Sequence, residues 1–148
     1  MKESGLWSAL RTKCKGLWIA RRIESPDTEP GIADVTYSLL IGVRGWIELK
    51  HIHKYPVSPK TPIRIEHYTP VQKLFLWKEG NNAGYAFLFI QIERDYLLFD
   101  HVAAQNVGEL TKQEMIDCAI GYWSGALPPR DFISKLSIKV EDPRRKNA

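Results

Sequence analysis

The sequence predicts an α/β domain with a mixed central β-sheet flanked by helices. A length of 148 residues suits one ordinary domain, and a composition of 44% apolar and 26% charged residues is globular. Short β-branched runs alternate with segments of helical spacing, which gives the element order α-β-β-β-α-β-β-α. No internal repeat, low-complexity tract or linker divides the chain, so we expect residues 1–148 to form a single domain.

The N-terminal segment combines a helix with a first strand. Apolar residues at helical spacing predict a helix over 3–15, which Gly16 would end. Residues 17–23 have the composition of a strand, and the prolines and glycine of 24–31 indicate a loop.

A β-hairpin is predicted next, because residues 34–40 and 43–52 are rich in β-branched and aromatic side chains. A reversal centred on Ile41, with the following glycine at positive φ, would set Asp34 opposite Glu48. Opposed residues have Cβ atoms about 5 Å apart, which is close enough for two carboxylates to share a divalent ion.

A second reversal of this hairpin is also compatible with the sequence. It would be centred on residues 43–44, because Gly45 permits a turn there. Asp34 would then lie towards His53, and the carboxylate pair would be lost. The sequence does not decide between the two registers.

A capped helix and another hairpin follow. Residues 69–72 (Thr-Pro-Val-Gln) form a capping box with a first-turn proline, which predicts a helix that Gly80 would end. Residues 85–92 and 96–99 predict two strands joined across 93–95.

The C-terminal part is expected to be helical. A second capping box opens a helix over 111–120, and a short helix is predicted after Pro129. We therefore divide the domain into a core of about 3–100, a helical extension of about 108–138 and a basic tail at 141–148.

Positive charge is concentrated in parts of the chain. The net charge is +4, and the stretches 11–22 and 50–64 each carry several cations and no acid. The tail adds Arg144, Arg145 and Lys146. Such clusters suit a polyanion such as nucleic acid, although a solvated basic face has the same composition.

Cysteine usage and hydropathy indicate an intracellular protein. Cys14 and Cys118 cannot form a disulfide framework, and the sequence has no Cys-x-x-Cys zinc pair. No apolar run is long enough to cross a bilayer, and no secretory signal follows residues 1–5. We therefore expect a cytoplasmic protein without a membrane partner.

The segment Glu48-Leu49-Lys50 carries the strongest chemical signal. Residues two apart in a strand face the same side, so Glu48 and Lys50 project together while Leu49 turns into the core. Burying such charges requires a partner or a metal. Asp34, across the predicted hairpin, supplies a second carboxylate.

These residues together offer the oxygen ligands of a magnesium site. Mg²⁺ prefers carboxylates and carbonyls, so we expect Asp34, Glu48 and the main-chain carbonyl of Leu49 to hold it. In phosphodiester hydrolysis, Mg²⁺ held in this way polarises the phosphate and acidifies water. Lys50 could orient the attacking water or stabilise the developing negative charge.

Three segments carry a resemblance to a known group of enzymes. They are Gly31-Ile32-Ala33-Asp34, Glu48-Leu49-Lys50 and Tyr68-Thr69-Pro70-Val71-Gln72. Together they resemble the PD-(D/E)XK nuclease superfamily, and more narrowly the stand-alone VRR-NUC nucleases of phages, which are similar to Holliday junction resolvases. The resemblance spans residues 3–100 and departs from the family at Ala33, where proline is usual. It implies a restriction-endonuclease-like fold, and the host cytoplasm if the protein is phage-encoded.

The resemblance also implies roles for individual residues. Asp34 and Glu48 would bind Mg²⁺, with Mn²⁺ expected to substitute, and Lys50 would be the catalytic lysine. Glu3, on the first helix, would be an outer carboxylate of the metal site, and Gln72 an accessory active-site residue. Both have structural explanations as well, Glu3 as a first-turn helix acid and Gln72 as the third residue of its capping box.

Other residues are weaker candidates for the metal site. Asp27 follows a proline, but its polar loop is not followed directly by a strand. His51 and His53 would face away from Glu48 in a regular strand. DNA contact or solvent exposure is therefore preferred to a zinc site for these histidines.

The cations of the two basic stretches are the candidates for contacts with the DNA backbone. They are Arg11, Lys13, Lys15, Arg21, Arg22, Lys54, Lys60 and Arg64. Phosphate contacts carry no base-sequence information, which suits recognition of branched DNA, such as four-way junctions, by shape. Junction cutting needs two symmetric sites, so we expect a homodimer, and residues 119–127 suit its interface or the core equally.

Two other functions are compatible with the same residues. The chain could be a nuclease of nicked, flap or linear duplex DNA, since these residues do not specify the substrate. It could also be a DNA-binding module with a decayed catalytic site. The presence of Asp34, Glu48 and Lys50 together argues against decay.

Overall fold

The structure is a computed structural model that describes residues 3–23 and 31–140, apart from the side chains of Glu3, Ser4 and Ala83. Its elements in chain order are α1 (Glu3–Lys13), β1 (Ile19–Arg22), β2 (Val35–Ser38), β3 (Arg44–Ile52), α2 (Pro70–Ala83), β4 (Ala86–Ile92), β5 (Asp95–Asp100), η1 (Ala103–Gln105), α3 (Lys112–Cys118), β6 (Gly121–Ser124) and α4 (Pro129–Lys135).

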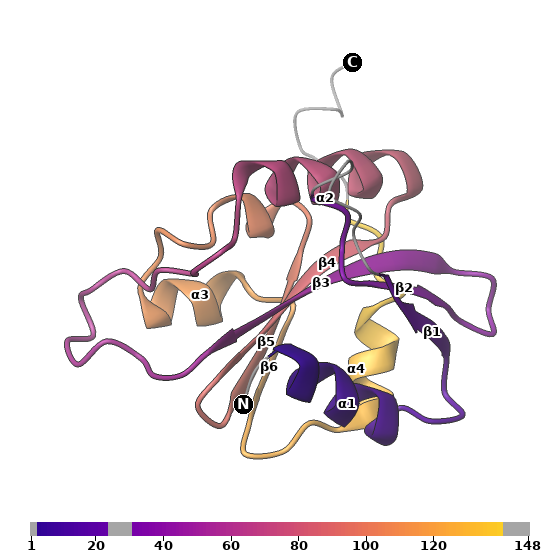
Figure 1. The fold of residues 1–148 in the computed structure, drawn as a ribbon, viewed down its shortest axis with the longest axis horizontal. Coiled ribbons are helices and arrows are strands. Elements are labelled where there is room, and N and C mark those ends of the chain that lie inside the picture. The colour runs from indigo at the N-terminus through magenta and orange to yellow at the C-terminus, as the bar shows by residue number, and fades with distance from the viewer. Residues whose placement is uncertain (1–2, 24–30, 141–148) are drawn as a thin grey trace.

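The strands form one six-stranded mixed sheet in the order β1-β2-β3-β4-β5-β6. Strands β3 and β4 pair in parallel, and the other neighbours pair antiparallel. Figure 1 shows helices on both sides of this sheet. The predicted mixed α/β architecture is therefore confirmed.

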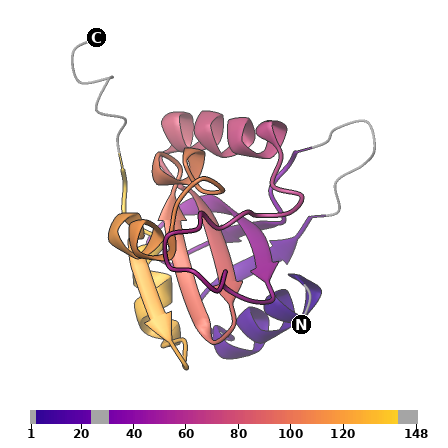
Figure 2. The same ribbon diagram turned by 90° about the vertical axis from the view of Figure 1, so that its left-hand side faces the viewer.

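Helices cover both faces of the sheet (Figures 1 and 2), and each face buries its own hydrophobic core. On one side, Leu10 of α1 and Phe132 of α4 pack with strand residues such as Leu49. On the other side, Leu76 of α2 and Met115 of α3 are buried with the opposite side chains of the strands. We call these sides the α1 face and the α2 face. Alternate residues of each strand therefore point to different helices.

The β2–β3 hairpin has the first of the two predicted reversals. Val35 pairs with Ile47, which centres the reversal on Ile41. Gly42 has a φ of 86°, and its N–H donates to the Leu39 carbonyl at 3.1 Å. Glycine adopts this conformation without the steric cost that other residues meet, so the turn fixes the register of both strands.

Helix α2 begins as predicted but ends later. The capping box forms, with the Gln72 N–H donating to Thr69 Oγ1 (3.2 Å) and the Thr69 N–H to Gln72 Oε1 (2.9 Å). The expected stop at Gly80 is wrong, and the helix is closed instead by Gly84 at a φ of 89°. A Cβ at Gly80 would overlap the His101 ring, so this glycine serves close packing rather than helix termination.

The C-terminal part contains a strand that was not predicted. Strand β6 pairs with β5 and extends the sheet, while α4 covers the α1 face with Phe132 and Leu136. Residues 108–138 are therefore not a purely helical extension. Four residues paired on one side give little periodic signal, which explains why the strand was missed.

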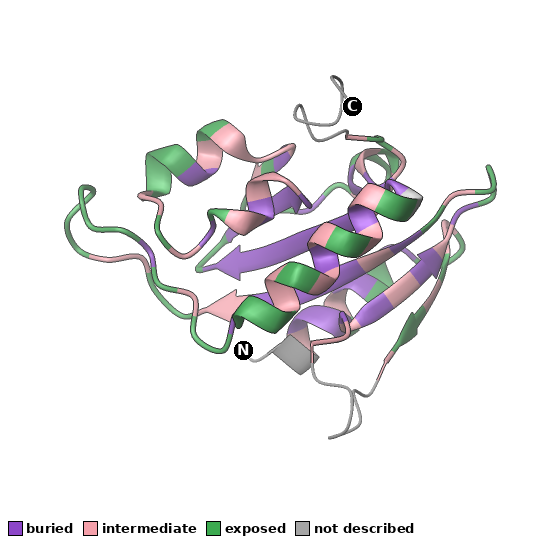
Figure 3. Ribbon diagram, turned by 90° about the horizontal axis from the view of Figure 1, so that it is seen from above, coloured by how far each residue is buried: buried purple, intermediate pink, exposed green. Residues whose placement is uncertain are grey.

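Burial follows this layered arrangement. Figure 3 shows buried central strands beneath α2, whose outer surface is exposed. Among the described residues, every helix is too short or too polar to span a bilayer.

Candidate active site

Asp34 and Glu48 occupy neighbouring positions on adjacent strands. One more step in the ladder that pairs Val35 with Ile47 places Asp34 opposite Glu48. Directly opposed residues project on the same side of a sheet, so both carboxylates lie on the α2 face. The turn at Ile41 thus brings together the two acids that the first predicted register requires.

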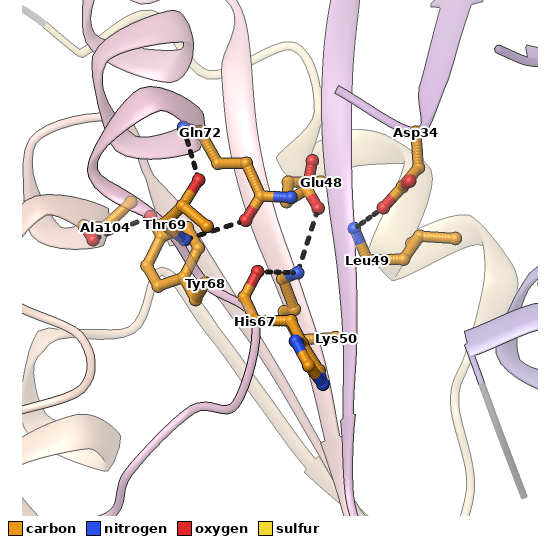
Figure 4. A network of polar contacts seen from close by, with 9 residues as sticks. All are labelled: Asp34, Glu48, Leu49, Lys50, His67, Tyr68, Thr69, Gln72 and Ala104. Atoms are coloured by element: carbon orange, nitrogen blue, oxygen red, sulfur yellow. Dashed lines mark hydrogen bonds and ion pairs between the residues drawn. The ribbon is translucent and has the colours of Figure 1, made fainter. Parts of the chain in front are cut away.

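Glu48 and Lys50 are a buried ion pair. Their exposed fractions are 1% and 3%, and Lys50 Nζ lies 3.4 Å from Glu48 Oε2. The ammonium also donates to the main-chain carbonyl of His67 at 2.8 Å, where the backbone has a φ of 61° (Figure 4). Lys50 is therefore held from two sides, by its own strand and by the segment that precedes α2.

Asp34 is positioned by the backbone of β3. Its Oδ2 accepts the N–H of Leu49 at 2.9 Å, and Figure 4 shows the carboxylate beside this strand. In an extended strand the N–H and C=O of one residue point to the same side. The carbonyl of Leu49 is therefore directed towards the edge that Asp34 occupies, as the predicted ligand set requires.

The approach of α2 to this edge depends on Gly31. It has a φ of 93°, and a Cβ there would overlap the side chain of Val71, in the first turn of α2. The glycine of the predicted motif thus lets the chain enter β2 directly beneath the start of α2. This close approach fixes where Asp34 leaves the loop.

The protonation of Glu48 is strongly perturbed. Burial, and after it the negative charge of Asp34, raise the pKa of Glu48 to about 9, although the Lys50 ammonium opposes both effects. Among the described residues, Glu48 Oε1 has no hydrogen-bond partner. A buried carboxylate oxygen without a donor is costly, and a bound cation would remove that cost.

Tyr68 forms one wall of the site, although it had been given no role. Its ring centroid lies 6.0 Å from Lys50 Nζ and 5.2 Å from Lys73 Nζ. Its hydroxyl donates to the Ala104 carbonyl at 2.9 Å, and burial raises its pKa. The available signal was its position directly before the capping threonine.

The two accessory residues inferred from the resemblance, Gln72 and Glu3, lie on opposite faces of the sheet. The Gln72 carbonyl oxygen is engaged in the capping box, while Figure 4 shows its side chain reaching towards Glu48. Glu3 begins α1, which packs on the opposite face of the sheet, and its side chain lies outside the described residues. Asp27 also lies outside them.

Other metal-binding arrangements find no support in the described part of the chain. No group of three or more His, Cys, Asp or Glu side chains there could hold an ion. His51 pairs with Gln91 on the α1 face, away from Glu48, and burial lowers its pKa. A metal here would therefore rest on Asp34, Glu48 and main-chain oxygen.

The predicted DNA-contacting cations are all exposed but do not share one face. Arg11 and Lys13 lie in the last turn of α1 and Lys15 follows it, on the side of the sheet away from Glu48. Lys54, Lys60 and Arg64 lie in the segment between β3 and α2. The structure adds Arg44, an exposed cation at the start of β3 that was not singled out.

A separate cavity lies between the 55–63 segment and strand β5. It has a volume of about 480 Å³ and is lined by the 55–63 segment, Asp95 and Lys112. Asp95 accepts hydrogen bonds of 2.6 Å from the Tyr55 and Ser124 hydroxyls. These polar groups satisfy one another, so their hydrogen bonds hold the 55–63 segment against the edge of the sheet.

Comparison with protein-family models and with curated protein sequences finds no match for this chain.

Proposed function

We propose that this protein is a Mg²⁺-dependent endonuclease that hydrolyses DNA phosphodiesters at the site formed by Asp34, Glu48 and Lys50. The observation that carries the proposal is the buried Glu48 carboxylate, paired with Lys50 and facing a second acid across the hairpin. Such a cluster costs stability unless a ligand uses it.

The donor set fits Mg²⁺, with Mn²⁺ as a substitute. Asp34, Glu48 and the Leu49 carbonyl would hold the ion, and Glu48 Oε1 has no competing donor among the described residues. When bound, the ion supplies polarisation of the phosphate and a lower pKa for an adjacent water. Because Glu48 retains a proton unusually well, ion binding must release that proton.

Lys50 is the residue best placed to act on the reacting phosphate. The His67 carbonyl and Glu48 hold its ammonium beside the carboxylates. A fixed positive charge at this point would stabilise negative charge that develops on the phosphate oxygens, or orient the attacking water. Gln72 would contribute from α2 as an accessory polar group.

Branched DNA, such as a four-way junction, is the substrate we favour, with the protein acting as a homodimer. The support is the sequence resemblance described above and the need for two symmetric sites in junction cutting. Residues 119–127 remain a candidate interface. They include β6, an edge strand whose Tyr122 is exposed.

Cleavage assays test the proposal. Labelled four-way, flap, nicked and linear DNA are incubated with the protein, with and without Mg²⁺. We expect Mg²⁺-dependent cutting that is fastest on four-way junctions. Equal rates on linear duplex would remove the junction assignment, and binding without any cutting would leave a DNA-binding module.

Substitution of Lys50 tests its role in catalysis. Lys50→Ala should lower the single-turnover cutting rate by ~100-fold or more and leave DNA affinity nearly unchanged. Lys78→Ala, which removes an exposed lysine of α2, is the matched control. Equal losses of affinity and rate in Lys50→Ala would show that the lysine is only a phosphate contact.

A further inference from the structure

A basic groove lies beside the candidate active site on the α2 face. Figure 3 shows α2 crossing the middle of the sheet and leaving the β1–β2 end uncovered by any described helix. The groove there has a volume of about 420 Å³ and is lined by Ile19, Arg21, Thr36, Tyr37, Ser38 and Arg44.

Strand register decides which cations enter this groove. Arg21 pairs with Thr36, and Arg44 pairs with Ser38, so both arginines project on the α2 face. Arg22 pairs with Val35, a core residue of the α1 face. Two adjacent exposed arginines of β1 therefore point to opposite sides of the sheet.

The chemistry of the groove suits a phosphate backbone. Two exposed guanidinium groups lie near the hydroxyls of Thr36 and Ser38, and none of the lining residues is acidic. The cavity next to Tyr68, by contrast, includes Glu66 and Glu109. Guanidinium and hydroxyl groups are common donors to DNA phosphates.

The groove lies further along the strands than the carboxylates, and Arg21 also lies one strand to the side of Asp34. Arg21 is level with Thr36, two residues beyond Asp34, and Arg44 is four residues before Glu48. At a strand rise of about 3.3 Å per residue these offsets are about 7 and 13 Å. One DNA strand advances about 3.4 Å per nucleotide, so the offsets correspond to about two and four nucleotides.

We propose that this groove binds the DNA backbone on one side of the cut, with Arg21 and Arg44 contacting phosphates two to four nucleotides from it. Arg22, one of the DNA-contacting cations predicted from the sequence, faces the other side of the sheet and takes no part. The proposal rests on the proposed nuclease function for the position of the cut, but its binding prediction stands on the groove alone. It replaces a diffuse basic surface with two named contacts, one of which was not predicted from sequence.

Binding measurements with matched variants test this assignment. Fluorescence anisotropy with labelled linear duplex and four-way junction DNA, in EDTA so that DNA is not cut, gives the affinity of each variant at several salt concentrations. Arg21→Ala and Arg44→Ala should each weaken binding by ~10-fold and lower the salt slope by about 1. Arg22→Ala is the control and should change neither quantity.

A second experiment tests the position of the contacts. Neutral methylphosphonates are placed singly at phosphates one to six positions from the cut, on either side. Those two to four nucleotides away on one side should weaken wild-type binding, and the same changes should have little further effect in the double variant Arg21→Ala/Arg44→Ala. Interference that is equal on both sides would overturn the assignment.

The outcomes separate this inference from the nuclease proposal. The groove alone would be refuted if the wild type cuts DNA but Arg21→Ala and Arg44→Ala bind it with unchanged affinity. An equal loss of affinity in Arg22→Ala would also refute the groove alone. Arginine-dependent binding without cutting would support the groove and refute the nuclease. Absence of both binding and cutting would refute both proposals.

Discussion

Glu48→Gln should stabilise the metal-free protein, by an amount that grows with pH. The folded state holds the Glu48 proton up to a pKa of about 9, whereas the carboxyl of an unfolded chain titrates near a pKa of about 4.3. Between these values the folded state binds more protons, so the free energy of unfolding falls as pH rises. Glutamine keeps the shape of the side chain and has no proton to lose.

The size of this difference in the free energy of unfolding follows from proton linkage. One retained proton is worth about 1.4 kcal/mol per pH unit between these two pKa values, which is on the order of 1 kcal/mol per unit. From pH 5.5 to 8.5 the wild type should therefore lose about 3 kcal/mol relative to Glu48→Gln. That difference corresponds to a melting-temperature gap that widens by about 6–12 °C.

Thermal unfolding followed by circular dichroism measures this gap. Both proteins are melted in EDTA at several pH values, with Glu109→Gln, at an exposed acid, as control. Mg²⁺ at ten times its dissociation constant should add about 1.4 kcal/mol to the wild type and nothing to Glu48→Gln. Parallel pH curves for wild type and Glu48→Gln would show that Glu48 is ionised without metal, and would refute the reasoning.

Two further predictions concern the packing around the site. Gly80→Ala should lower the free energy of unfolding by about 1–3 kcal/mol in urea, because the new methyl group overlaps His101. The control is Asn82→Ala, at an exposed position of the same helix. An equal or smaller decrease in Gly80→Ala than in this control would contradict the prediction. Tyr68→Phe should lower the free energy of unfolding by about 1 kcal/mol, because it removes the hydrogen bond to Ala104. The ring stays beside Lys50, so junction cutting should persist. Loss of cutting at unchanged stability would assign the hydroxyl a catalytic role.

The sequence was informative wherever local chemistry decides structure. Both capping boxes formed because Thr, Gln and Glu satisfy the helix N–H groups through short-range contacts. The register of the β2–β3 hairpin remained open between two reversals, since Gly42 and Gly45 both permit a turn. The second reversal would pair Val35 with Ile52 instead of Ile47, and this odd shift would turn Val35 and Tyr37 away from the α1 face, where both are buried.

What could not be predicted depends on distant parts of the chain. The stop assigned to Gly80 was wrong because His101, on a later segment, requires a glycine there. The side of the sheet that each cation faces requires the pairing of β1 with β2, which adjacent arginines in the sequence do not reveal. The sequence thus located the basic stretches but not the side of the sheet that each cation faces.

Glu48 is a buried acid in a mostly apolar part of the sheet, which supports a functional site there. Leu88 and Ile90 of β4 lie directly beside Glu48 and Lys50, and an apolar pair at these two positions would pack with them at less cost. The contact with Lys50 leaves Glu48 Oε1 without a hydrogen-bond partner among the described residues, and Asp34 sets a second acid against Glu48. If Glu48 and Lys50 form only a structural salt bridge, removal of the Asp34 charge should raise the free energy of unfolding. If they belong to a cation site, the same change should lower the affinity for Mg²⁺. Measurement of Mg²⁺-induced stabilisation in Asp34→Asn therefore discriminates between the two.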